Sequence, residues 1–257
     1  MEFIDTHAHL YVEQFRDDRA DMIARAKDDK VTKVVLPNID AASSQHLIDL
    51  YLSDKDFFVP MMGLHPCSVD TDYKSELDQI GAHFLRHDFV SVGEIGLDYY
   101  WDTSKIKEQK DAFVTQLGWS KAKNLPVAIH CRDSFDDILT ILEKEQDGAL
   151  RGVLHCFSGN REQAQRLIDL GFYLGVGGVL TYKNSGLDKV LETVDLKHLV
   201  LETDAPYLSP IPFRGKRNES AYIIYIAEKL AEVQTCKLEK VATQTTLNAK
   251  ILFGLTD

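Results

Sequence analysis

The sequence lacks any apolar run long enough to cross a membrane. Its longest such segment, residues 171–180, has ten residues and is rich in glycine, whereas a spanning helix needs about 20 apolar residues. The first residues also lack the basic segment followed by an apolar one that marks a secretory signal. We therefore expect a protein without a membrane span that stays in the cytoplasm.

Cysteine is scarce, with four residues among 257 and no Cys-x-x-Cys pair. Such wide spacing is typical of reduced thiols in a cytosolic chain and gives no disulfide framework. Cys131 and Cys156 each directly follow a histidine on an expected strand. Because neighbouring strand residues face opposite sides, we expect both cysteines to be buried packing residues and not ligands.

Positive charge is in deficit, since 29 Lys and Arg face 40 Asp and Glu and give a net charge of −11. This balance argues against a protein that coats nucleic acid non-specifically, because such binding neutralises many phosphates. It leaves room for a local basic pocket that binds one or two phosphates. With 44% hydrophobic and 27% charged residues, the composition is that of a globular protein with an ample core.

Short apolar runs alternate with longer amphipathic segments along the whole chain. The expected strands are 2–6, 32–37, 57–64, 89–94, 126–131, 152–156, 172–176 and 198–203, and the expected helices are 17–29, 43–53, 74–86, 107–123, 135–145, 160–170, 184–194, 220–234 and 237–252. Eight strand–helix units without a linker imply right-handed crossovers and one parallel sheet. A doubly wound sheet would favour a glycine-rich turn where His7-Ala8-His9 stands. We therefore predict an α/β fold, a single-domain (β/α)8 TIM barrel over residues 1–257.

Histidines and carboxylates gather at the ends of the expected strands. His7 and His9 are two residues apart, so in a strand they project from the same face, and two such imidazoles can bind one cation. The fourth, fifth, sixth and eighth strands end on further candidates, namely Glu94, His130, His155 and Asp204. In a barrel all these ends meet at one rim. The sequence thus predicts that the six residues share one site.

Four imidazoles and two carboxylates suit divalent cations such as zinc, manganese or magnesium. Six ligands are too many for one tetrahedral site with an open position, and they fit two metals with Glu94 as the bridge. Two metals lower the pKa of a shared water and stabilise the attacking and leaving oxygens of a displacement. Asp204 would bind a metal and accept the proton of that water as a general base. The alternative is a purely structural role for the six residues.

Three further polar residues lie beside these candidates. His65 precedes Pro66 at a turn, which fits a substrate contact and a packed or supporting position behind the ligands equally. Glu202 faces away from Asp204 by strand alternation, which favours an ion pair or a supporting contact behind the ligands. Asp98 is interpreted as loop scaffolding.

Seven motifs follow one another from Asp5 to Asn218: D-T-H-x-H-L, G-x-H-P, V-G-E-x-G-L-D, I-H-x-R, H-x-F-S-G, E-T-D-A-P-Y and P-x-R-G-K-R-N. Together they closely resemble the TatD family of metal-dependent deoxyribonucleases, which belongs to the amidohydrolase superfamily of (β/α)8-barrel hydrolases. The resemblance covers essentially the whole chain and implies metal ligands at the same six residues. Glu94 stands where related amidohydrolases carry a bridging carbamylated lysine, as is usual in the TatD group.

A phosphodiester substrate requires positive groups, and arginine binds phosphate through two parallel hydrogen bonds. Arg132 lies two residues after His130 and so shares its face, and Arg214 lies on the loop after the eighth strand. We predict phosphate contacts for both, whereas Lys216 fits an ordinary charged surface loop. Aromatic residues that could stack on bases occur in the expected rim loops, although loop packing also explains them: Tyr99, Tyr100, Trp101, Phe157, Tyr182 and Tyr207.

Two functions remain open. The first is a deoxyribonuclease of the 3'-5' exonuclease type that trims DNA ends or single strands. The second is a metal-dependent hydrolase of a small amide, ester, lactone or phosphoester. A non-catalytic binding protein would require an incomplete ligand set, and all six positions are filled. The native metal, exo or endo cleavage, and the oligomeric state are left open, and a monomer is compatible with the sequence.

Overall fold

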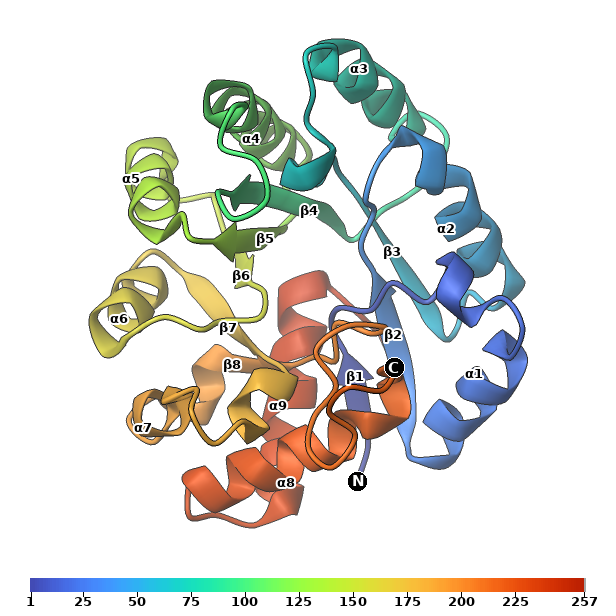
Figure 1. Ribbon diagram of the computed structural model, residues 1–257, viewed down its shortest axis with the longest axis vertical. Helices are drawn as coiled ribbons and strands as arrows, with labels where there is room; N and C mark the ends of the chain where they lie inside the picture. Colours follow the sequence, from blue (N-terminus) through green and yellow to red (C-terminus); the bar gives the residue numbers. More distant parts are fainter. Residues whose placement is uncertain (257) are drawn as a thin grey trace.

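The computed structural model describes residues 1–256 and contains eight parallel strands inside a ring of helices (Figure 1). The strands are β1 (Phe3–Asp5), β2 (Val31–Leu36), β3 (Phe58–Met62), β4 (Ser91–Asp98), β5 (Val127–Arg132), β6 (Gly152–Leu154), β7 (Phe172–Val176) and β8 (Leu199–Leu201). They pair in chain order, each parallel to the next. The Thr6 N–H donates to the Leu201 carbonyl (3.0 Å), and the His9 N–H donates to the Ala205 carbonyl (2.7 Å). These bonds bring the last strand back to the first and confirm the (β/α)8 barrel.

The helices follow the strands as the sequence predicts. They are α1 (Arg19–Asp28), α2 (Ala41–Ser53), α3 (Tyr73–His83), α4 (Ile106–Lys123), α5 (Phe135–Glu145), α6 (Arg161–Asp169), α7 (Leu187–Leu191), α8 (Ile223–Val233) and α9 (Leu238–Phe253). Helix α7 is shorter than the expected 184–194, and it begins only at Leu187 because Gly186 before it has a left-handed φ of 69°. Within residues 1–256, no helix combines the length and the apolar character needed to cross a membrane.

One end of the barrel interior is filled with apolar side chains. Strand residues that point inward form a layer with the last helix: Ile4, Val35, Val59, Met61, Ala128, Val153 and Val200 pack with Ala249, Leu252 and Phe253. Helix α9 lies next to β1 and β8 at this end (Figure 1). The amino end of the barrel is therefore closed by a hydrophobic plug, and the carboxyl end carries the polar residues.

Candidate metal centre

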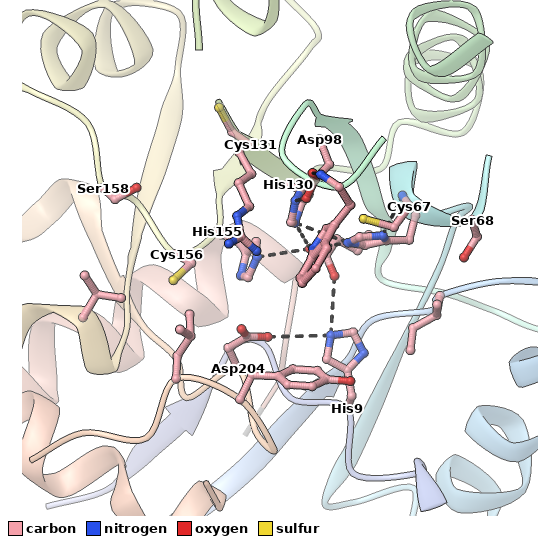
Figure 2. A pocket seen from close by; sticks show the side chains of 18 of the residues that line it. His9, Cys67, Ser68, Asp98, His130, Cys131, His155, Cys156, Ser158 and Asp204 are labelled. Atoms are coloured by element: carbon pink, nitrogen blue, oxygen red, sulfur yellow. Dashed lines mark hydrogen bonds and ion pairs between the residues drawn. The ribbon is translucent and has the colours of Figure 1, made fainter. Parts of the chain in front are cut away.

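A cavity of about 920 Å³ opens among the loops at the carboxyl ends of the strands (Figure 2). Five of the six predicted ligands line it: His9, Glu94, His130, His155 and Asp204. The sixth, His7, is fully buried beneath the cavity and stacks on His155, with 3.8 Å between ring centroids. The tertiary structure therefore brings all six predicted residues together.

Strand alternation explains how two of these residues reach the cavity. Ala128 and His130 are two residues apart on β5, so both face inward, Ala128 in the apolar plug and His130 above it. Val153 on β6 and His155 just past its end are related in the same way. The inward faces of β5 and β6 thus change from packing to possible ligand residues over one strand repeat.

Glu94 lies at the centre of the cluster. Its Oε2 atom is 3.1 Å from Nε2 of His7 and 3.5 Å from Nε2 of His9. Its Oε1 atom is 2.9 Å from Nδ1 of His130 and 3.1 Å from Nε2 of His155. Each carboxylate oxygen therefore faces a different pair of imidazoles, which is the arrangement a bridging ligand between two cations requires.

Asp204 completes the cluster from the loop after β8. Its Oδ1 atom lies 3.7 Å from Nε2 of His9 and 3.8 Å from Nε2 of His7, and Figure 2 shows the carboxylate facing His9. The residue has a left-handed φ of 58°, and its N–H donates to the His7 carbonyl (2.8 Å). Buried Asp5 fixes Thr203, the residue before Asp204, because the Thr203 N–H and hydroxyl donate to the two carboxylate oxygens of Asp5 (2.9 and 2.6 Å).

The buried charges shift one another's protonation. Burial alone raises the pKa of the Glu94 carboxyl, but the imidazoles of His65, His155 and His7 favour its charged form and lower that pKa well below its usual range. Burial lowers the pKa of His7 well below its usual value. Burial also raises the pKa of Asp204 to about 6. Glu94 is therefore an anion at neutral pH, and Asp204 has a pKa suited to accepting a proton.

The donor set fits divalent cations. Three groups have ligand atoms within 4.8 Å of one another: His7, His155 and Asp204; His7, His9 and Glu94; and His65, Glu94 and His130. Protonation of the imidazole nitrogens is unfavourable here, because protonating both His7 and His155 would place two positively charged rings in a stack. A divalent cation binds imidazole nitrogens and carboxylate oxygens at the same time, so it would pair the lone pairs of the histidines and the charge of the carboxylates.

His65 lies within the cluster, beside two of the predicted ligands. Its Nε2 atom is 3.5 Å from Oε1 of Glu94 and 3.3 Å from Nδ1 of His130. Its Nδ1 atom accepts a hydrogen bond from the Cys67 N–H (3.1 Å). The His65 ring lies beside Glu94 and also lines the cavity. A contact between His65 and the substrate stays a prediction.

Asp98 supports the loop after β4, as expected, and it also contacts a candidate ligand. It is the last residue of β4, it is 1% exposed, and its Oδ2 atom lies 2.8 Å from Nε2 of His130. Strand β4 extends past the expected 89–94 because Gly96, with a φ of 144°, lets β5 approach so closely that a Cβ there would lie 2.0 Å from the His130 carbonyl oxygen. In the sequence, the motif Gly96-Leu97-Asp98 was the feature that could have indicated this contact.

Glu202 supports the cluster from behind. Its Oε1 atom is 3.3 Å from Nδ1 of His155 and also accepts a hydrogen bond from the Cys156 N–H. This position agrees with the expected ion pair away from Asp204. Carboxylates thus stand behind two candidate ligands, Asp98 behind His130 and Glu202 behind His155, and such partners fix the orientation of a ligand ring.

The two predicted phosphate-binding arginines occupy different positions. Arg132 lines the cavity, and its guanidinium lies 3.7 Å from the ring centroid of Tyr100. Arg214 is exposed and lies 4.4 Å from the ring centroid of Tyr182, which itself lines the cavity. Arg217 instead binds both carboxylate oxygens of Asp18 at 2.6 Å. The basic loop after β8 therefore has one residue that anchors it and another near the cavity.

The expectation that the two cysteines of the cavity wall are buried was wrong. Cys131 and Cys156 are only partly buried and both line the cavity. Cys156 follows the end of β6 with a φ of 47°, so strand alternation no longer sets its direction. Among the aromatic residues, Phe157 is 1% exposed and belongs to the core, and it is not available to a substrate.

Comparison with known proteins agrees with this geometry. The family model described as TatD related DNase matches residues 4–254. The uncharacterized metal-dependent hydrolase YabD of Bacillus subtilis is 40% identical, covering 98% of each chain. The 3'-5' ssDNA/RNA exonuclease TatD of Pantoea ananatis is 32% identical, covering 98% of this chain and 99% of its own. The crystal structure of YJJV, a TatD homolog from Escherichia coli, superposes with a TM-score of 0.93 at 30% identity, covering 99% of this chain and 98% of that one. The chain therefore belongs to the TatD family and is a metal-dependent hydrolase.

Proposed function

We propose that this protein hydrolyses phosphodiester bonds of DNA, as a 3'-5' exonuclease acting on ends or single strands. The observation that carries the proposal is the position of Arg132, an exposed cation on the wall of a cavity whose floor holds the cluster around Glu94. A cation beside a metal centre suits a phosphate, which carries charge through every step of hydrolysis. The exonuclease name of a relative with 32% identity supports the same reaction.

The proposed ligands of two divalent cations, magnesium, manganese or zinc, are the six predicted residues, with Glu94 as the bridge. When bound, such cations activate water and stabilise charge on phosphate oxygens. Asp204 would accept the proton of the attacking water, since burial holds its pKa at about 6. Asp98 and Glu202 would keep His130 and His155 in place.

Arg132 and Arg214 would hold the phosphates of the substrate, and His65 would contact either the substrate or a metal. Arg132 reaches the cavity from the last position of β5. Arg214 stands beside Tyr182 and is exposed to solvent. We further propose that residues 1–257 act as one catalytic domain in the cytoplasm, and that a monomer is sufficient because all proposed residues lie in one chain.

Hydrolysis of a small amide, ester, lactone or phosphoester is the alternative, because the same metals activate water toward a carbonyl carbon. A neutral carbonyl substrate makes no use of the exposed arginines. Replacing Arg132 or Arg214 by alanine would then leave activity on a neutral amide, ester or lactone intact, whereas a small phosphoester is charged and would lose activity. On the nuclease proposal, each change lowers kcat/KM for DNA by roughly 10-fold or more, since a hydrogen bond to a charged group contributes about 1.5–3 kcal/mol.

The test is incubation of metal-reconstituted protein with end-labelled single- and double-stranded DNA, beside an Asp204→Asn control. Magnesium, manganese and zinc are supplied separately. We expect stepwise shortening from the 3' end by the wild type, and a loss of about 10²–10⁴-fold in the control, the range of a general base. Equal inertness of both proteins with all three metals would overturn the nuclease proposal and leave the metal-dependent hydrolase.

A further inference from the structure

Two large aromatic side chains stand exposed beside the cavity. Tyr100 is 55% exposed and Trp101 is 70% exposed, on the loop that follows β4. Their rings meet edge to face with 4.9 Å between centroids, and Trp101 lines the cavity. Aromatic side chains of this size normally bury most of their surface. Their exposure here leaves flat apolar faces next to the candidate metal centre.

Arg132 joins these rings to the cavity. Its guanidinium lies 3.7 Å from the Tyr100 centroid and 5.3 Å from the Trp101 centroid. Within residues 1–256, no carboxylate lies within ion-pair distance of this guanidinium. Stacking on a ring occupies the flat face of the guanidinium and leaves its N–H groups at the edge able to bind an anion.

Asp98 fixes this loop relative to the candidate ligands. Its Oδ1 atom accepts hydrogen bonds from the backbone N–H groups of Tyr100 (2.9 Å) and Trp101 (3.2 Å). Its Oδ2 atom lies 2.8 Å from Nε2 of His130. One buried carboxylate therefore sets the position of both aromatic residues against a ring that contacts Glu94.

We propose that the exposed face of Trp101 is a stacking subsite for a nucleobase, that Tyr100 supports Trp101 edge to face and carries the Arg132 guanidinium, and that Arg132 holds the adjacent phosphate. The proposal rests on the proposed phosphodiesterase function and adds to it the side chains that would bind a base next to the phosphate. Every base presents a flat π-face, so such a subsite tolerates any sequence. Bases inside a duplex are stacked and paired, so a single strand or a frayed end would be preferred.

The first test compares two oligothymidylates, one of them abasic at its last two 3' positions, and the matching pair of oligouridylates to separate DNA from RNA. Stacking of one base should favour the base-bearing strand in kcat/KM by about 5- to 150-fold. In Trp101→Ala this preference should fall toward unity, and in Trp101→Phe, which keeps an aromatic face, most of it should remain. Leu85→Ala, at an apolar residue that is 86% exposed and does not line the cavity, is the control and should match the wild type.

An unchanged preference in Trp101→Ala would overturn the stacking subsite and leave the nuclease function intact. If the wild type cleaves none of the oligonucleotides, both proposals fail together. Hydrolysis of methyl p-nitrophenyl phosphate in that case would identify an enzyme for small phosphoesters. The two failures are therefore distinguishable in the same set of assays.

The second test observes binding without cleavage. The chain has two tryptophans, and the second, Trp119 in α4, packs against Phe84 at the end of α3. A phosphorothioate-linked oligothymidylate, which resists hydrolysis, should quench the tryptophan fluorescence of the metal-loaded wild type. In Trp101→Phe only Trp119 remains, and the quenching should disappear. Equal quenching in both proteins would contradict stacking on Trp101.

Discussion

The two ends of the barrel interior use the same strand faces for opposite purposes. Toward the amino end, Ala128 and Val153 lie in an apolar layer closed by α9. Toward the carboxyl end, His130 and His155 follow them by two residues and surround Glu94. Strand alternation places Ala128 and His130 on one face, and Val153 and His155 on another. On each face, the residue nearer the amino end packs in the core and the residue nearer the carboxyl end belongs to the candidate metal centre.

This difference indicates that the amino end contributes mainly to stability and the carboxyl end mainly to activity. The amino end gains from burial of apolar surface, at roughly 25 cal/mol per Å². The carboxyl end holds buried imidazoles and carboxylates, whose desolvation opposes folding until a partner or a cation compensates. We therefore expect changes at the amino end to alter stability, and changes at the carboxyl end to alter metal binding and activity.

The largest effect is expected from a change at the amino end. Phe253→Ala removes a side chain that is 4% exposed in the apolar layer, and should reduce the free energy of unfolding by about 3–5 kcal/mol. Urea denaturation measures this loss. The kcat of the folded fraction at 25 °C should be unchanged, because Phe253 does not line the cavity.

Leu247→Ala is the matched control, since Leu247 lies on the same helix and is 48% exposed. Its effect on the free energy of unfolding should stay within about 0.5 kcal/mol. A fall in kcat of folded Phe253→Ala protein would break the separation between the two ends.

A smaller effect is expected from the carboxylate behind His130. Asp98→Asn keeps an oxygen for the backbone N–H groups of Tyr100 and Trp101 but removes the charge next to Nε2 of His130. Metal affinity should fall about 10- to 100-fold, as is typical for such supporting residues. Calorimetric titration with Mn²⁺ or Zn²⁺ measures it.

Asp102→Asn serves as the control on the same loop, because Asp102 is exposed and its carboxylate accepts from the nearby Ser104 N–H. Its metal affinity should equal that of the wild type. If Asp98→Asn binds metal as tightly as this control, Asp98 has no influence on the metal centre and acts on the loop alone.

The smallest effect is expected from the anchor of the basic loop. Arg217→Ala removes the paired contacts to Asp18 (2.6 Å each) and the contact with the Phe15 ring (4.6 Å). The side chains of Arg217 and Asp18 are 32% and 35% exposed, so the free energy of unfolding should fall by only about 0–1 kcal/mol. KM for DNA should rise a few-fold, because Arg214 lies on the loosened loop.

Lys216→Ala, an exposed change on the same loop, should leave the thermal transition of the protein unchanged. Thermal unfolding and initial rates on single-stranded DNA compare the two variants. A rise in KM for Lys216→Ala that equals that of Arg217→Ala would show that loop charge, and not anchoring by Asp18, controls substrate binding.

The amino-acid sequence by itself determined the barrel and the six residues of the candidate centre. The strand and helix periods are local properties, so the elements and their order could be predicted from neighbouring residues. Parallel strands in a barrel then place their carboxyl ends at one rim. His7, Glu94 and His155 could therefore be assigned to one site although they are far apart in the chain.

Apart from Glu202, which the sequence placed behind the ligands, only the tertiary structure decided which polar residues support that site. Asp98 reaches His130 because β4 extends beside β5 at Gly96, and Arg217 pairs with Asp18 across 199 residues of chain. The placement of Trp101 beside Arg132 likewise joins the loop after β4 to the end of β5. These contacts depend on how distant segments pack, which no local period encodes, and so they could not be predicted before the fold was known.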